Sequence, residues 1–177
     1  MKYRIEKDSL GEVKVPQKAL WGAQTQRALD NFTISGIKFA FPFGRSFIEA
    51  LGIIKFSAAS ANQKLKLLTA KKAAPIKAAS KDVIKGLYDD SFPLDVFQTG
   101  SGTSTNMNAN EVIANRAHVI SGGNLEDIDK IIHPNDDVNK SQSSNDTFPT
   151  ALHIAAYQMI SHKTIPAIKQ LRNTIDI

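Results

Sequence analysis

The sequence contains no cysteine among its 177 residues. Disulfide frameworks, thiolate nucleophiles and cysteine-bound zinc or iron–sulfur clusters are therefore excluded, and such a composition is typical of a reducing compartment. No run approaches the roughly 18 consecutive apolar residues of a membrane-spanning helix, and the N-terminal segment lacks the apolar stretch of a signal peptide. We therefore expect a soluble, cytoplasmic protein with no membrane partner.

Arginine is scarce where positive charge is dense. The net charge is +5, and much of the surplus lies in one segment at helical spacing: Lys64, Lys66, Lys71, Lys72, Lys77, Lys81 and Lys85. These lysines alternate with apolar residues and have no interleaved aromatic side chains. A solvated helix face explains them better than a nucleic-acid-binding patch, so no nucleic-acid partner is expected.

The spacing of apolar residues predicts a mainly α fold. Hydrophobic types make up 42% of the chain, which suffices for a globular domain. Residues 3–16 instead predict a short hairpin-like or extended segment with a turn at Ser9-Leu10-Gly11. The strongest helical signal is an apolar stripe of about five turns at Phe47, Leu51, Ile54, Ala58, Ala61 and Leu65.

Further helices are predicted on both sides of the middle of the chain. Pro75 suits the first turn of a helix, whose stripe continues through Ile76, Ala79, Val83 and Leu87. A helix over 106–121 is predicted to end at Gly122-Gly123, because Met107, Glu111, Ala114 and His118 recur at helical spacing.

The last third of the chain is also predicted to be helical. Asp146 is a candidate N-cap, followed by a stripe at Leu152, Ala156 and Met159. Pro166 is predicted to open or kink a final helix. The helical pattern is still running at Ile177, which predicts a longer helical array that has been cut.

Two polar loops could carry chemistry, and the first runs from Gln98 to Thr105. Its glycines allow close approach of a ligand to the backbone, its hydroxyls supply neutral donors, and it opens a helix whose N-terminus favours an anion. It could therefore hold a carboxylate or phosphate, or it could simply cap its own helix through Ser104 or Thr105. It matches neither a P-loop nor a dinucleotide-binding fingerprint.

The second polar loop runs from His133 to Asp146 and could also orient a small anion through neutral donors and one lysine. A metal site at His133, Asp136 and Asp137 is weakly supported because no second histidine lies nearby, and none is expected. The remaining histidines fall on predicted helices, where packing or surface positions are expected: His118, His153 and His162.

These loops and their flanks resemble the class II fumarases of the fumarase/aspartase superfamily. The resembling motifs span essentially the whole chain: Tyr3 to Asp8, Trp21 to Arg27, Gln98 to Thr103, Thr105 to Asn108, Asn110 to Asn115, His133 to Asp136 and Lys140 to Asp146. The alternative within the superfamily is an aspartase, an ammonia-lyase that acts on a similar dicarboxylate. Aspartases tend to have Ala-Gly-Thr in place of Ser-Gly-Thr, Asn in place of His133, and Ser-Thr-Asn in place of Ser-Ser-Asn, so fumarase is favoured.

The resemblance implies the site residues. Those for fumarate or L-malate are Ser101, Gly102, Thr103, Ser143, Ser144 and Asn145, and those of a secondary anion site are His133, Pro134, Asn135 and Asp136. No metal or other cofactor is implied. Asp137 departs from the fumarase pattern, which usually has histidine there, and is expected to add negative charge beside the secondary site.

The resemblance also implies the architecture: the N-terminal domain of the fumarase/aspartase fold over residues 1–142, then the first helices of a central helical bundle over 143–177. In the family this bundle builds a homotetramer, and three subunits form each site. A chain with only the first bundle helices is expected to expose an apolar helix face.

The reaction implied is the reversible trans hydration of fumarate to L-malate through an aci-carboxylate, whose charge neutral donors stabilise. The family's acid and base residues lie beyond the end of this sequence, so no catalytic residue is assigned here and no turnover is expected from the chain alone. A non-catalytic binding or assembly module is the remaining alternative.

Overall fold

The computed structural model describes residues 2–38 and 44–175. Its only sheet in these ranges is an antiparallel hairpin of β1 (Tyr3–Asp8) and β2 (Gly11–Pro16), in which Arg4 lies opposite Val15. The predicted hairpin and its turn are therefore confirmed. The Arg4 guanidinium is buried and donates to the carbonyls of Ala19 and Trp21, which ties the hairpin to the chain that follows it.

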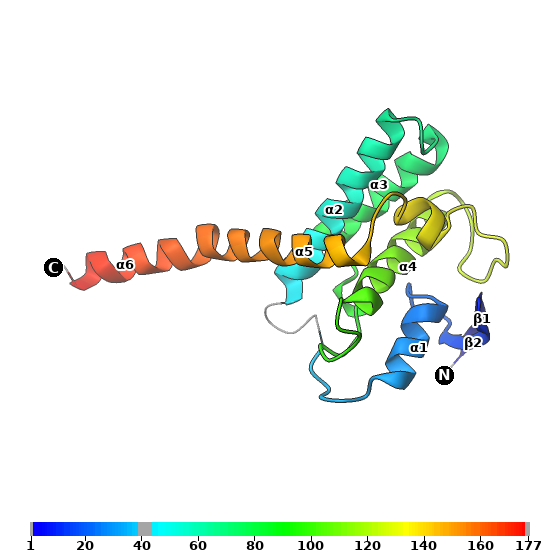
Figure 1. The fold of residues 1–177 in the computed structure, drawn as a ribbon, viewed down its shortest axis with the longest axis horizontal. Coiled ribbons are helices and arrows are strands. Elements are labelled where there is room, and N and C mark those ends of the chain that lie inside the picture. The colour runs from blue at the N-terminus through cyan, green and yellow to red at the C-terminus, as the bar shows by residue number, and fades with distance from the viewer. Residues whose placement is uncertain (1, 39–43, 176–177) are drawn as a thin grey trace.

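Helices make up most of the remaining structure, so the mainly α fold is confirmed (Figure 1). The α-helices are α1 (Ala23–Asn31), α2 (Gly44–Lys64), α3 (Ala70–Ile84), α4 (Thr103–Ile120), α5 (Ser144–Met159) and α6 (Ile165–Ile175). Short 3₁₀ or π turns lie between some of them: η1 (Asp89–Ser91), η2 (Pro134–Val138) and η3 (Ile160–Thr164).

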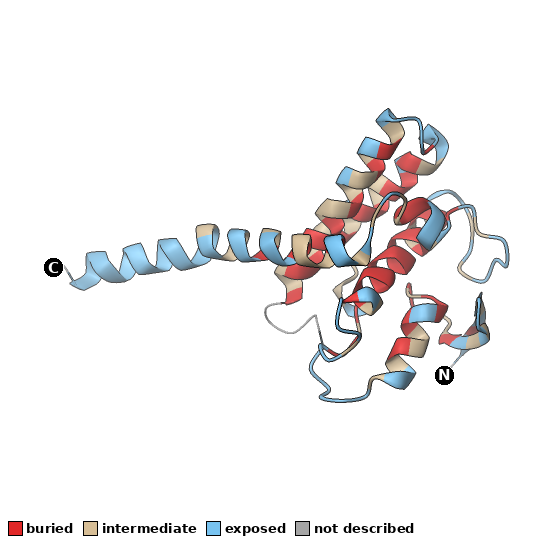
Figure 2. Ribbon diagram, in the orientation of Figure 1, coloured by how far each residue is buried: buried red, intermediate tan, exposed pale blue. Residues whose placement is uncertain are grey.

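The centre of the core is α4. It packs against α1, α3, α5 and η2, and all its residues from 105 to 118 are buried except the half-buried Arg116 (Figure 2). The predicted helix is therefore confirmed, although it begins at Thr103 rather than Asn106 and is buried on nearly every side. The His118 Nδ1 accepts a hydrogen bond from the Ile131 N–H, so the ring proton lies on Nε2, which donates to Asp127 Oδ2 at 2.8 Å.

The stripe predicted on α2 is correct only in its first half. Phe47 and Leu51 are buried, but Ala61 and Leu65 are exposed, and the buried face continues instead through Lys55, Ala59 and Asn62. A lysine and an asparagine occupy the buried face of α2. A search for apolar periodicity assigns such polar residues to the solvent face, and it therefore predicted the wrong face for the second half of the helix.

The boundaries of α3 also differ from the prediction. The helix begins at Ala70, so Pro75 lies in its interior rather than in its first turn. It ends at Ile84, before Leu87, which is exposed. Most of the surrounding lysines are exposed, in agreement with a solvated face: Lys64, Lys66, Lys71, Lys81 and Lys85.

The start of α5 corrects the predicted cap. Ser143, not Asp146, is the N-cap, and its hydroxyl accepts from the Asn145 N–H at 3.2 Å. The buried face is formed by Ala151 and Ala155, so the stripe predicted one position later lies mostly in solvent, with Leu152 and Ala156 exposed.

The helices α5 and α6 form one long rod that leaves the core and ends far from it (Figures 1 and 2). The turn η3 joins them just before Pro166, consistent with a proline at a local change of helical geometry. All of α6 is exposed, including Ile168 and Leu171. Ile177, at which the helical pattern was predicted to be still running, lies outside the described residues. Within those residues, no helix has the length and apolarity needed to cross a bilayer.

Candidate functional site

The first polar loop ends at Gly102, which is the N-cap of α4. Gly102 has φ +68° and ψ +22°, in the left-handed region that favours glycine. A Cβ added there would lie 2.1 Å from the ring of Phe148 on α5. Only glycine therefore lets the α4 loop and the first turns of α5 approach this closely.

The same two helix starts are joined by a hydrogen bond. The side-chain amide of Asn106, in the first turn of α4, donates to the Ser144 hydroxyl oxygen at 2.8 Å. Ser144 is the first residue of α5. The N-termini of α4 and α5 thus lie side by side, and the partial positive charges of both are concentrated in one place.

Most of the predicted substrate-binding side chains are free to meet a ligand. Ser101, Thr103, Ser143 and Asn145 are exposed, and Ser144 is half-buried. The Ser101 and Thr103 hydroxyls lie 2.8 Å apart. The close approach of Gly102 to Phe148 brings the loop that carries this pair against α5.

The start of α4 is capped by the side chain of Gln98. The Gln98 side-chain oxygen accepts from both the N–H and the hydroxyl of Thr105, at 2.8 and 2.9 Å. The alternative in which Ser104 or Thr105 caps the helix is therefore not what the structure shows, because the Gln98 side chain crosses the loop and accepts these hydrogen bonds. As a result, the hydroxyls of Ser101 and Thr103 are not needed as caps.

Asp95 anchors the start of this loop. Burial by itself would raise the pKa of its carboxyl group, but hydrogen bonds from Phe97, Ser35 and Gly36 lower it to about 2. The Asp95 carbonyl also accepts from the side chain of Gln98 at 3.0 Å. The segment after α1 is therefore bound by the ionised Asp95 carboxylate, and the α4 cap is bound by the backbone carbonyl of the same residue.

Sequence reasoning missed Lys55, which lies behind the second loop. This lysine on α2 is fully buried, and its Nζ donates to Asn106 Oδ1, Asn139 Oδ1 and Gln142 Oε1 at 2.8, 2.9 and 3.0 Å. Burial lowers the pKa of Lys55 to about 7, whereas its three amide acceptors favour the ammonium form. The available signal was a lysine four residues after Leu51 on an apolar helix face.

The residues of the predicted secondary anion site lie at the start of η2. His133 is its N-cap, and its Nδ1 accepts from the Asp136 N–H at 3.1 Å. His133, Asn135 and Asp136 are exposed, and Pro134 is half-buried. The His133 ring and the Asp136 carboxylate are also 3.2 Å apart, so they form an ion pair when the ring is protonated.

Asp137, the departure from the family pattern, points inward. It is 7% exposed, and its carboxylate contacts Lys72 of α3. One of its oxygens also accepts from the His133 N–H at 2.8 Å. The negative charge is therefore paired within the protein rather than presented beside the loop.

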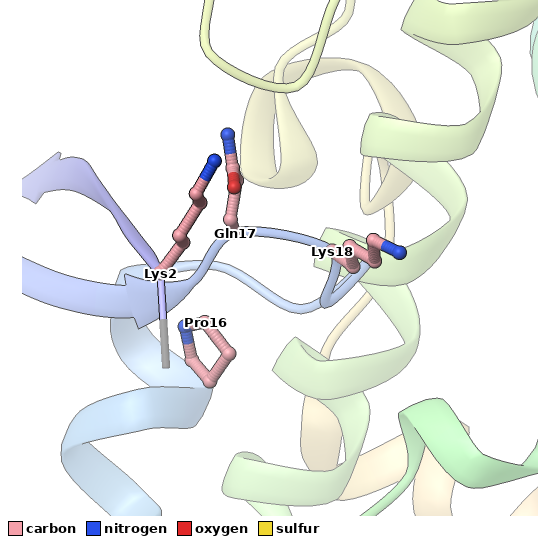
Figure 3. A pocket seen from close by; sticks show the side chains of 4 residues that line it. All are labelled: Lys2, Pro16, Gln17 and Lys18. Atoms are coloured by element: carbon pink, nitrogen blue, oxygen red, sulfur yellow. The ribbon is translucent and has the colours of Figure 1, made fainter.

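Two surface cavities lie away from both polar loops. One of about 290 Å³ is lined by Lys2, Pro16, Gln17 and Lys18, where Lys2 and Gln17 extend in one direction and Lys18 in another (Figure 3). A second, of about 440 Å³, lies between Gln17 and the segment after α4. Neither contains a predicted site residue. No group of three or more acidic or histidine side chains in residues 2–38 and 44–175 is placed to hold a metal.

Comparison with known proteins assigns the chain to a family. The model of a family described as Lyase matches residues 11–177. The chain belongs to this lyase family. The class II fumarate hydratase of Bacillus subtilis (strain 168) is 54% identical to this chain over 176 residues, which cover 99% of this chain and 37% of that protein. That of Halobacterium salinarum is 53% identical, covering 98% and 36%.

Solved structures of the lyase family have the same fold. The crystal structure of recombinant class II fumarase from Schistosoma mansoni matches with a TM-score of 0.91 and 39% identity, covering 97% of this chain and 35% of that one. A fumarate lyase:delta crystallin from Brucella melitensis matches with a TM-score of 0.82 and 49% identity, covering 87% and 34%. The chain thus spans little more than a third of the length of these relatives.

Proposed function

We propose that this lyase-family chain supplies substrate-carboxylate-binding groups for the reversible hydration of fumarate to L-malate. The observation that carries the proposal is the identity of more than half with class II fumarate hydratases along nearly the whole chain. The geometry supports it, because a hydrogen bond from Asn106 to Ser144 joins the starts of α4 and α5, and helix N-termini with exposed hydroxyls beside them suit a carboxylate.

The proposed substrate-binding residues are those of the two helix starts: Ser101, Gly102, Thr103, Ser143, Ser144 and Asn145. Removal of a proton from the carbon next to a carboxylate places charge on that carboxylate in the transition state. Neutral donors aimed at it stabilise the transition state more than the ground state. The chain's proposed role is binding and charge stabilisation, and no acid or base of the reaction is assigned within it.

We also propose a secondary anion site at His133, Pro134, Asn135 and Asp136, with weak affinity for an anion. The His133 N–H, which could bind an anion, already donates to the Asp137 carboxylate. The nearby Asp136 carboxylate is exposed and would repel an anion. We expect a free carboxylate to bind here more weakly than at the α4–α5 site.

We further infer that residues 143–177 begin a helical bundle that assembles four copies in the cytoplasm, with residues 1–142 as the N-terminal domain. The rod exposes large apolar side chains, including Leu152, Ile160, Ile168 and Leu171, each at least half exposed. A row of exposed apolar side chains marks an interaction surface. Light scattering across protein concentration tests this, and Leu171→Glu should weaken any assembly.

The proposed function is tested by titrating the isotopically labelled chain with L-malate and following backbone amide resonances. Shifts centred on residues 101–103 and 143–145 are expected, and L-aspartate should produce smaller ones if the chain is not aspartase-like. Absence of L-malate shifts at both segments would contradict the proposal. A parallel assay of fumarate absorbance measures turnover, which is not expected from this chain alone.

The binding or assembly alternative is supported by the same exposed rod. It predicts that adding the chain to a full-length class II fumarate hydratase changes the activity of that enzyme. A chain that only binds substrate leaves that activity unchanged, so mixing separates the two functions.

A further inference from the structure

Lys55 is a buried cation without a buried anion to match it. No carboxylate within the described ranges forms an ion pair with its Nζ. The carboxylates on neighbouring elements have partners of their own: Glu111 accepts from the start of α1, and Asp137 pairs with Lys72. A buried charge is costly unless its donors are satisfied, so the three amide acceptors explain how Lys55 is tolerated.

The ammonium of Lys55 fixes how the Asn106 amide is turned. Because Lys55 has only donors, it faces the Asn106 oxygen, and the Asn106 nitrogen must point the other way. The two hydrogens of that nitrogen have two acceptors, Asn139 Oδ1 at 3.1 Å and Ser144 Oγ at 2.8 Å. Every hydrogen-bonding position of this amide is therefore consistent with a protonated Lys55.

The orientation of the Asn106 amide affects Ser144, one of the proposed substrate-binding residues. Since the Ser144 hydroxyl oxygen accepts from Asn106, its own proton is left to donate elsewhere. A hydroxyl that accepts from one partner donates more strongly to the next, because hydrogen bonds in a chain polarise one another. With Asn106 turned over, its oxygen would take the Ser144 proton instead.

We propose that Lys55 is a positioning residue which, through Asn106, makes the Ser144 hydroxyl a hydrogen-bond donor toward the substrate carboxylate. This rests on the proposed function of Ser144, but the orientation of Asn106 is a property of the chain without ligand. Lys55 also holds Asn139 and Gln142, so the loop that leads into α5 is set by the same ammonium.

The test is nuclear magnetic resonance on the 177-residue chain at pH 6, where Lys55 is protonated. In the unsubstituted chain, the Asn106 amide hydrogens should show cross-relaxation to the Ser144 Hβ protons. In Lys55→Met these cross-peaks should be lost, because methionine has a similar length but donates no hydrogen bond. Their absence from the unsubstituted chain overturns the proposal even if the variant does not fold, and their persistence in a folded Lys55→Met also overturns it.

Lys77→Met is the matched control. Lys77 also donates to a side-chain amide, Gln63 Oε1 at 2.8 Å, but has no link to Ser144. This variant should keep the Asn106 cross-peaks.

A ligand arm separates the two proposals. With L-malate as the probe, Lys55→Met should raise the Kd about tenfold, the effect of losing one good hydrogen bond, while Lys77→Met should leave it unchanged. Equal Kd values in a folded Lys55→Met and the unsubstituted chain count against the positioning role. If the unsubstituted chain does not bind L-malate, the proposed function fails, and the Asn106 cross-peaks still decide the role of Lys55.

Discussion

The Lys72 ammonium contacts both carboxylate oxygens of Asp137, at 2.9 and 2.8 Å. The carboxylate is nearly buried, whereas the lysine side chain is 39% exposed. The pair joins α3 to the turn η2, and Asp137 Oδ2 accepts from the His133 N–H as well as from Lys72. A residue that looks disruptive in the sequence is therefore a structural link.

Asp137→Asn should lower the free energy of unfolding by about 1–2 kcal/mol, because the amide cannot keep two contacts with a cation. Denaturant unfolding measures this. Combined with Lys72→Met, the effects should be less than additive, with a coupling of about 1 kcal/mol after allowing for the exposure of Lys72. Strict additivity would show that the ion pair contributes nothing.

Gly102→Ala should destabilise the chain by at least about 2 kcal/mol. Alanine is strained at φ +68°, and its Cβ would overlap the Phe148 ring. Gly100→Ala is the matched control in the same loop, since an added Cβ there meets nothing within 4 Å. Similar unfolding midpoints for the two variants would refute the close contact between the α4 loop and α5.

Asp95→Asn should destabilise the chain at pH 7 and have a diminishing effect in acid. The pKa of this carboxyl group is lowered from 3.8 to about 2, so its stabilisation is complete above about pH 4 and is lost as the pH falls through 2. Urea unfolding at pH 7, 4 and 2.5 would follow the loss. If the difference in unfolding free energy between Asp95→Asn and the unsubstituted chain does not change with pH, the lowered pKa of Asp95 is contradicted.

Lys55 should make stability depend on pH in the alkaline range. Burial lowers its pKa from 10.5 to about 7, so between these values the unfolded chain binds more protons and stability rises with pH. The slope is at most about 1.4 kcal/mol per pH unit. Lys55→Met should remove it, as unfolding at pH 7, 8 and 9 would reveal. If the unfolding free energies of the two proteins change with pH in parallel from pH 7 to 9, the pKa of Lys55 in the folded chain does not lie in this range.

The sequence predicted the elements that obey simple rules. The helical spacing of Met107, Glu111, Ala114 and His118 predicted α4, and Gly122 adopts φ +93° just after the helix ends. The hairpin likewise has a turn sequence between two extended segments. At α4 and the hairpin, the local sequence pattern and the tertiary packing favour the same secondary structure, so the sequence pattern was sufficient to predict it.

Prediction failed where distant segments decide the outcome. The burial of Lys55 depends on amides from two other segments, and Gln98 caps α4 from across a loop. The face of α5 that packs inward is the one with the small residues Ala151 and Ala155, because it approaches α2 closely, while the larger Leu152 remains outside. Apolar spacing cannot distinguish two apolar faces of one helix.

The rod formed by α5, η3 and α6 is held by the core at one end only. Helices without tertiary contacts are marginally stable in water, so local opening should become easier with distance from Ala151 and Ala155. Amide hydrogen exchange should accordingly be slow near these alanines and fast beyond Ile165. Protection along the rod would then report, residue by residue, how much of it a second molecule covers.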